Sequence, residues 1–175
     1  MLTAIKEQLK TLASDPADQF HLKIRRRIGK RATYILEKKL KQLILLLPIL
    51  VSRIHQHWNH QKSKSEIKKL GGFLLAYLYH PKDFLSEAEQ GFFGYLDDAY
   101  LVAVVYETVL KELIESGEGL VGTDEKLRDE VKDLQRAATI VIPKEAEKIN
   151  RMVEEILEGN RHTFVGLFSE EGVGK

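Results

Sequence analysis

No cysteine occurs in this chain of 175 residues, which excludes disulfides, thiolate metal sites and thiol catalysis. The first residues mix polar and apolar side chains, so we expect no secretory leader. The longest uninterrupted apolar run, residues 43–51, would rise about 14 Å in a helix, whereas a bilayer core is roughly 30 Å thick. Because that run is too short to span a membrane by itself, we expect a cytoplasmic protein, with peripheral membrane contact as an alternative.

The chain combines 43% hydrophobic with 30% charged residues, a balance typical of a globular protein rather than a disordered one. At this length we expect one helical domain over residues 1–160 and an irregular tail over residues 161–175. The net charge of +1 conceals a polarity: residues 23–41 carry nine basic side chains and one acid, whereas residues 107–158 carry fourteen acids and eight bases. This asymmetry indicates a basic functional surface, or pairing between the two segments within or between chains.

Apolar side chains recur with a helical period along nearly the whole chain. The expected helices cover residues 2–12, 20–54, 66–79, 97–115, 123–138 and 143–158. The second of these is one long helix or two broken ones, and Pro48 should kink it. Residues 99–106 are apolar on almost every side and should lie at the centre of the core, while strand is confined at most to residues 139–142 and 163–168. The expected fold class is therefore all-α, a small helical bundle around a central antiparallel hairpin of the third and fourth helices.

Residues typical of helix starts and ends support the expected helix boundaries. Ser63 and Glu66 fit a capping box before the third helix, and Pro143 suits the first position of the last helix. Ser116-Gly117-Glu118-Gly119 should end the fourth helix, and Gly159-Asn160 should end the last one.

The most distinctive stretch is residues 77–98, where one apolar run ends, an acid-rich loop follows and a second apolar run begins. We expect Asp83 to cap a short turn, and Asp97 or Asp98 to cap the following helix. The alternative is a cation or partner site, since clustered carboxylates suit hard cations. The residues of this candidate motif are Pro81, Asp83, Glu87, Gly94, Tyr95, Asp97 and Asp98.

This stretch resembles the core of the small bacterial YkvA-like family, also called domain of unknown function 1232, over about residues 66–116. That core reads roughly Tyr-Leu-x-x-Pro-x-Asp-Leu-Ile-Pro-Asp, a short spacer, and Gly-Tyr-Leu-Asp-Asp. The matching residues are Tyr77, Leu78, Pro81, Asp83, Gly94, Tyr95, Leu96, Asp97 and Asp98. Here Ser86 and Glu87 replace the Pro-Asp pair, and the spacer is longer than in the family. The family has no settled biochemical activity, so the resemblance implies an architecture and leaves the reaction open.

Six cations would line one face of a continuous helix, with Tyr34 among them: Lys23, Arg27, Lys30, Arg31, Lys38 and Lys41. Such a face could track the phosphates of nucleic acid or anionic lipid headgroups. The alternative, which we favour, is that these cations pair with the acidic segment or are covered by a partner. A single interleaved aromatic residue argues against base stacking on single strands.

The three histidines at positions 55, 57 and 60 indicate a polar helix end rather than a metal site, because only two of them share a helical face. The sequence shows no catalytic triad and no zinc-protease motif, so we expect neither an enzyme nor a cofactor, and no small-molecule substrate is evident.

The function expected is therefore that of a non-enzymatic helical interaction or adaptor module, which binds a protein partner or its own copy. One alternative is peripheral binding to an anionic membrane or nucleic acid through the basic face of residues 23–41. The other is a cation-dependent protein that uses Asp83, Asp97 and Asp98.

Overall fold

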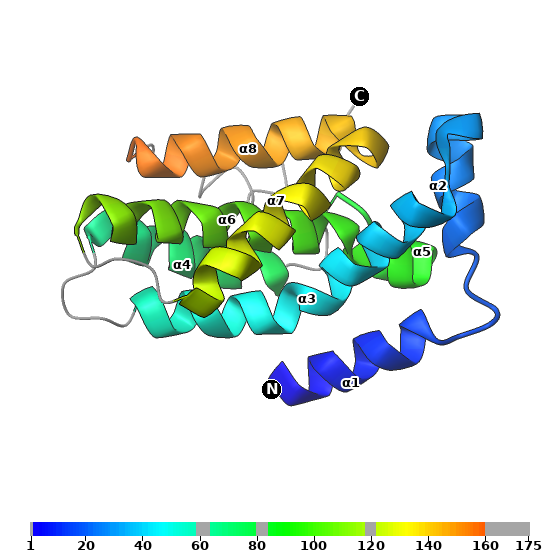
Figure 1. The fold of residues 1–175 in the computed structure, drawn as a ribbon, viewed down its shortest axis with the longest axis horizontal. Coiled ribbons are helices and arrows are strands. Elements are labelled where there is room, and N and C mark those ends of the chain that lie inside the picture. Colours follow the sequence, from blue (N-terminus) through cyan, green and yellow to red (C-terminus); the bar gives the residue numbers. More distant parts are fainter. Residues whose placement is uncertain (1, 59–63, 80–83, 118–121, 160–175) are drawn as a thin grey trace, which may run out of the picture.

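The structure of the protein is a computed structural model, in which residues 2–58, 64–79, 84–117 and 122–159 are described. These described residues form helices and connecting turns and contain no β-strand, which confirms the all-α fold (Figure 1). The α-helices are α1 (Leu2–Ala13), α2 (Phe20–Ile28), α3 (Tyr34–Trp58), α4 (Ser65–Leu78), α5 (Glu87–Gln90), α6 (Leu96–Glu115), α7 (Gly122–Val141) and α8 (Pro143–Leu157). Two short 3₁₀ helices, η1 (Gly29–Arg31) and η2 (Gly91–Tyr95), follow α2 and α5.

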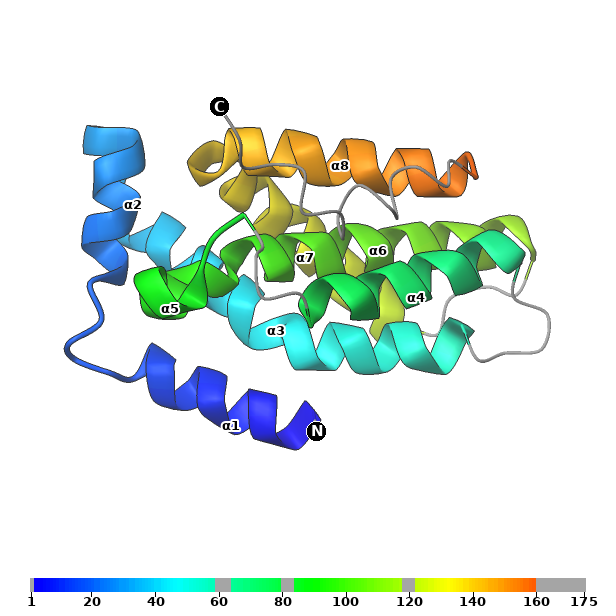
Figure 2. The ribbon, with the colours of Figure 1, turned by 180° about the vertical axis from the view of Figure 1, so that it is seen from behind.

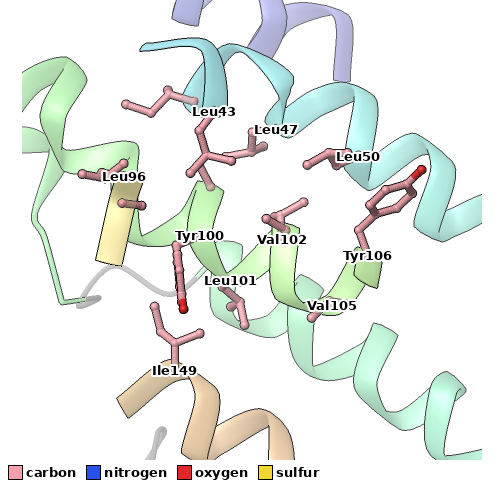
Figure 3. Close-up of a cluster of buried hydrophobic side chains, with 14 of the residues drawn as sticks. Leu43, Leu47, Leu50, Leu96, Tyr100, Leu101, Val102, Val105, Tyr106 and Ile149 are labelled. Carbon is pink, nitrogen blue, oxygen red and sulfur yellow. The ribbon is translucent and has the colours of Figure 1, made fainter. Parts of the chain in front are cut away.

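Helix α6 lies at the centre of the bundle and contacts α3, α4, α7 and α8. All of residues 99–106 except Val104 are buried, as their apolar pattern predicts. Leu50 of α3 lies beside Tyr106 of α6 in the buried cluster between these helices (Figure 3). A fully buried aliphatic or aromatic side chain contributes about 1.5–3 kcal/mol. The many buried side chains of α6 therefore contribute a large part of the hydrophobic stabilisation of the fold.

The expected hairpin is present, since α4 and α6 run antiparallel and contact each other (Figure 2). The most extensive helix contact, however, is between α3 and α6. Helix α3 also packs on α4 where Gly71 meets Trp58, because a Cβ at Gly71 would lie 1.9 Å from the indole ring. The centre of the bundle is therefore a group of three helices rather than the hairpin alone.

The segment expected as one long helix or two broken ones is broken, and the break falls at Gly29. This glycine has a φ of 60°, a conformation that favours glycine, and it ends α2. Helix α2 consequently stands across the end of the bundle instead of continuing into α3 (Figures 1 and 2). Helix α3 continues through Pro48, whose side chain is buried in the core.

The possible extended stretch at residues 139–142 was wrong, because α7 continues to Val141. Val141 and Ile142 are buried, so packing overrides the β-preference of branched side chains. The chain turns at Ile142, which precedes a proline and is therefore held out of the helical region. The other possible strand, residues 163–168, lies outside the described residues.

The remaining helix boundaries follow the local sequence. Pro143 occupies the first turn of α8, and Gly117 and Gly159 adopt φ values of 79° and 81° just beyond α6 and α8. At the start of α4, the Ser65 hydroxyl donates to the Glu66 carboxylate over 3.2 Å, whereas Ser63 of the expected capping box lies outside the described residues.

Candidate functional site

Asp97 is the structural centre of the motif in residues 77–98. It lies in the first turn of α6 and is fully buried. Its Oδ2 atom accepts hydrogen bonds from the Tyr77 hydroxyl (3.2 Å) and from the backbone N–H groups of Phe84 and Leu85 (3.1 Å each). This carboxylate therefore joins the end of α4, the segment before α5 and the start of α6.

The expectation that Asp97 or Asp98 caps α6 was wrong. The residue at the cap position is Tyr95, and its side chain makes no capping hydrogen bond. Asp97 instead faces the neighbouring segment, where two backbone N–H groups need an acceptor because they lie outside any helix. Asp98, beside it in the first turn, is also buried.

Other motif residues contribute to packing. A Cβ at Gly94 would lie 2.5 Å from the Glu87 Cα atom and 2.9 Å from the Ser86 carbonyl oxygen, so only glycine allows η2 to approach α5 this closely. The Tyr95 hydroxyl accepts a hydrogen bond from the Gln8 side chain of α1 over 2.9 Å. Pro81 and Asp83 lie outside the described residues.

The basic residues do not share one continuous helical face, because the break at Gly29 distributes them over three elements. Lys23 and Arg27 lie on α2, Lys30 and Arg31 on η1, and Lys38 and Lys41 on α3. The prediction that these six cations line one face of a continuous helix was therefore wrong. The cause is the left-handed conformation of one glycine, which a helical-wheel argument cannot include.

Three of these six cations form ion pairs. Lys23 lies 3.7 Å from Asp18 and also donates to the Gln90 carbonyl oxygen, and Lys41 lies 3.0 Å from Glu37. Arg27 pairs with Glu145 of the acidic segment at 2.9 Å, as expected for pairing between the two halves. Among the described residues, no ion pair involves Lys30, Arg31 or Lys38.

The cations Arg27 and Lys41 also cover aromatic rings. Arg27 lies 5.3 Å from the ring centre of Phe93, and Lys41 lies 5.4 Å from that of Phe20. Both contacts are within the range of cation–π attraction. These two cations thus hold α2 against its neighbours. Fewer than the six predicted cations are therefore available to bind a polyanion.

A groove along α3 is the surface that sequence reasoning missed. We call it the α3 groove; its volume is about 660 Å³, within the range of typical binding sites. Its apolar members are incompletely covered, since Tyr34 is 77% exposed, Leu45 36% and Ile49 42%. The lining residues are Tyr34, Glu37, Lys38, Lys41, Gln42, Leu45, Leu46 and Ile49.

The sequence shows no sign of the exposed apolar side of the α3 groove. Residues 43–51 are apolar without interruption, so their periodicity cannot show which side of the helix meets the core. Leu43, Leu47 and Leu50 turn inward, whereas Leu45 and Ile49 turn outward. The packing of α1, α4, α6 and α7 on the other sides of α3 separates the two groups.

Asp124, a buried carboxylate in the first turn of α7, has a structural role. It accepts a hydrogen bond from the Tyr106 hydroxyl over 3.2 Å and lies 3.9 Å from Arg53. Burial and the adjacent carboxylate raise the pKa of the Tyr106 phenol well above its usual range. This contact connects the middle of α6 to the start of α7.

The described part of the chain contains no group of three histidine or carboxylate side chains placed to hold a metal ion. His55 and His57 lie in the last turns of α3, where the His55 ring is 5.5 Å from that of Trp58, and His60 lies outside the described residues. None of the helices that the structure describes is both long enough and apolar enough to cross a bilayer.

Comparison of the chain with protein-family models, with curated proteins and with solved structures gave no significant match.

Proposed function

We propose that this protein is a non-enzymatic interaction module, which binds a partner protein through the α3 groove. The observation that carries the proposal is the exposure of Leu45 and Ile49 in a groove that also contains Lys38. Burial of apolar area is worth roughly 25 cal/mol per Å², so covering these side chains favours association. A helix that docks into such a groove is a common mode of protein recognition.

The proposed partner element is an amphipathic helix with acidic side chains toward one end. The stripe from Tyr34 to Ile49 covers 16 residues, and its ends lie about 22 Å apart at the helical rise, which is the length of roughly four turns. Its two ends differ in character: Lys38 lies near the start, and Leu45 and Ile49 lie toward the end. A partner helix with acids opposite Lys38 and apolar side chains opposite Ile49 would match this polarity.

A second candidate function, peripheral contact with an anionic membrane, is favoured by one observation. Tyr34 and Ile35 are strongly exposed close to Lys30 and Arg31, a mixture of apolar and basic side chains that suits a membrane surface. Nucleic acid has less support, since Tyr34 is the one aromatic residue among the predicted cations. The cation-dependent alternative is weakened because Oδ2 of Asp97 already accepts three hydrogen bonds.

The experiment places a photo-crosslinking amino acid at position 45, and at position 140 as a control, in the cells from which the chain comes. Ile140 of α7 is a similarly exposed apolar residue away from the groove. We expect a discrete protein adduct from position 45 alone. The identified protein, once purified, should bind the wild-type chain and lose binding to Leu45→Glu/Ile49→Glu, whereas Ile114→Glu/Ile140→Glu should bind normally.

Three other results would decide against a partner protein. Sedimentation of the purified chain as a dimer that the groove variant abolishes would assign the groove to a second copy. Binding to anionic vesicles that the same variant abolishes would assign it to a membrane. If Leu45→Glu/Ile49→Glu behaves as wild type in every assay, the groove has no binding function.

We also propose that the chain is related to the YkvA-like family and is cytoplasmic. Support for the relationship is that Gly94 and Asp97, two residues of the resemblance, secure the turn between α4 and α6 by close packing and by hydrogen bonds. The close packing requires a glycine and the hydrogen bonds use a carboxylate oxygen, so both positions would be expected to keep their residue type in a shared motif.

A further inference from the structure

A polar cleft lies between α6, α7 and α8, on a different part of the molecule from the α3 groove. Helices α7 and α8 meet at Ile142 and diverge from there, with α6 beside both (Figure 1). The cleft has a volume of about 410 Å³, within the range of small-molecule sites. Its lining is mostly polar, and the charged members come from α6 and α7.

The cleft carries more positive than negative charge. Lys111, Arg128 and Lys132 line it, against the single carboxylate of Glu107. Arg128 and Lys132 are four residues apart on α7, so two like charges lie on the same side of one helix, an arrangement that costs stability unless an anion lies between them. An excess of cations in a concave site is the arrangement that concentrates anions.

Glu107 does not neutralise these cations by direct contact. Within the described residues, no ion pair of 4.0 Å or less joins Glu107 to Lys111, Arg128 or Lys132. Burial raises the pKa of the Glu107 carboxyl, and the surrounding cations only partly oppose this. With its amide nitrogen turned toward Glu107, Gln135 donates to Oε1 over 3.1 Å, and Glu107 itself lines the cleft.

Neutral hydrogen-bonding groups complete the cleft on the side of α8. The Tyr100 hydroxyl and the Asn150 amide lie 3.2–3.3 Å apart, so each orients the other. The Thr108 hydroxyl donates to the Val104 carbonyl oxygen over 2.9 Å, which leaves its oxygen lone pairs as acceptors. A ligand in the cleft would thus meet cations, one carboxylate and oriented neutral groups.

We propose that this cleft binds a small phosphorylated molecule that also carries an amino group. Arg128, Lys132 and Lys111 hold the phosphate, because a guanidinium presents paired donors to phosphate oxygens and ammonium groups add point charges. Glu107 accepts from the amino group and so selects against phosphates that lack one. The site is independent of the proposed partner-binding groove and does not rest on it.

The test is a calorimetric titration of the full chain with phosphoethanolamine and with ethyl phosphate, which differ by the amino group. We expect phosphoethanolamine to bind more tightly. Arg128→Gln/Lys132→Gln should lose at least about tenfold in affinity for both probes, since charge-assisted hydrogen bonds are lost. The matched control, Lys126→Gln/Lys144→Gln, removes the same charge from exposed positions outside the cleft and should bind as wild type.

The selecting residue has its own test. Glu107→Gln should abolish the preference for phosphoethanolamine while ethyl phosphate binds at least as well as before, a pattern that loss of folding cannot produce. Vesicles that contain phosphatidylethanolamine separate the two sources of this chemistry, a lipid headgroup or a free metabolite. The proposal is wrong if the folded wild-type chain binds neither soluble probe nor these vesicles, or if the control variant loses binding as much as the cleft variant.

Discussion

Replacement of Asp97 by alanine should be one of the most damaging single changes to this fold. The substitution removes the acceptor for the Tyr77 hydroxyl and for the N–H groups of Phe84 and Leu85. A hydrogen bond to a charged group contributes about 1.5–3 kcal/mol, and an unsatisfied buried donor costs about 1–3 kcal/mol. Because the three bonds share one oxygen they are not additive, so we expect a loss of roughly 3–6 kcal/mol.

That loss is a large part of the total stability, which is about 5–15 kcal/mol for a domain of this kind. For a chain of 175 residues, 1 kcal/mol corresponds to about 2–4 °C in Tm, so the Tm should fall by roughly 6–24 °C. Asp97→Asn retains one carbonyl oxygen as an acceptor and should lose less than alanine. Asp129→Ala, an exposed aspartate on α7, is the control and should change stability by about 0.5 kcal/mol or less.

The assay is urea denaturation followed by circular dichroism, with the free energy of unfolding compared across the three variants. A cost below about 1 kcal/mol for Asp97→Ala would refute the reasoning, because it would mean that relief from burying a charge offsets the hydrogen bonds. If Asp97→Asn were as damaging as Asp97→Ala, the negative charge would matter more than the acceptor geometry.

Three further predictions concern backbone packing and pH. Gly94→Ala should destabilise the fold, because the new Cβ would overlap the α5 backbone. Gly72→Ala, whose Cβ would meet open space inside α4, should stabilise the fold by about 0.5–1 kcal/mol. Thermal melts of the two variants compare these effects. Glu107→Gln should be more stable than wild type at pH 7 and equal to it near pH 3, since a raised pKa means that the fold loses stability as the carboxyl ionises. Urea titrations at the two pH values measure the free energy of unfolding of both proteins. If the ionised carboxyl were stabilising, the variant would not be the more stable protein at pH 7. Tyr106→Phe deprives Asp124 of its donor and should cost about 1–3 kcal/mol at pH 7. The wild-type chain should also lose stability above about pH 10, where the unfolded phenol ionises and the folded one does not, and the Tyr106→Phe variant should lose less there.

The two proposed surfaces have different physical origins. The α3 groove is exposed because the apolar run of residues 43–51 presents more apolar side chains than its neighbours can cover. The polar cleft is open because α7 and α8 diverge from Ile142. Variants at one surface should therefore leave binding at the other unchanged.

The sequence by itself determined the all-α class, most of the helices and much of the core. Helical period, Pro143 and the glycines at positions 117 and 159 act through neighbouring residues only, so most helices and these ends could be predicted without knowing any distant contact. The break at Gly29 and the continuation of α7 to Val141 were not predicted. The burial of residues 99–106 was equally accessible, because a helix turn that is apolar on nearly every side has no polar face to present to water.

Only the tertiary structure decided which side chains and surfaces these helices bring together. The position of Asp97 was evident in the sequence, but its acceptor role depends on the amides of Phe84 and Leu85, thirteen and twelve residues away along the chain. The salt bridge of Lys39 with Asp133, at 2.7 Å, joins residues 94 positions apart, and no local pattern selects one acid of the segment over another. Both surfaces depend on where whole helices stop packing against each other, which is a property of the assembled bundle rather than of any stretch of the chain.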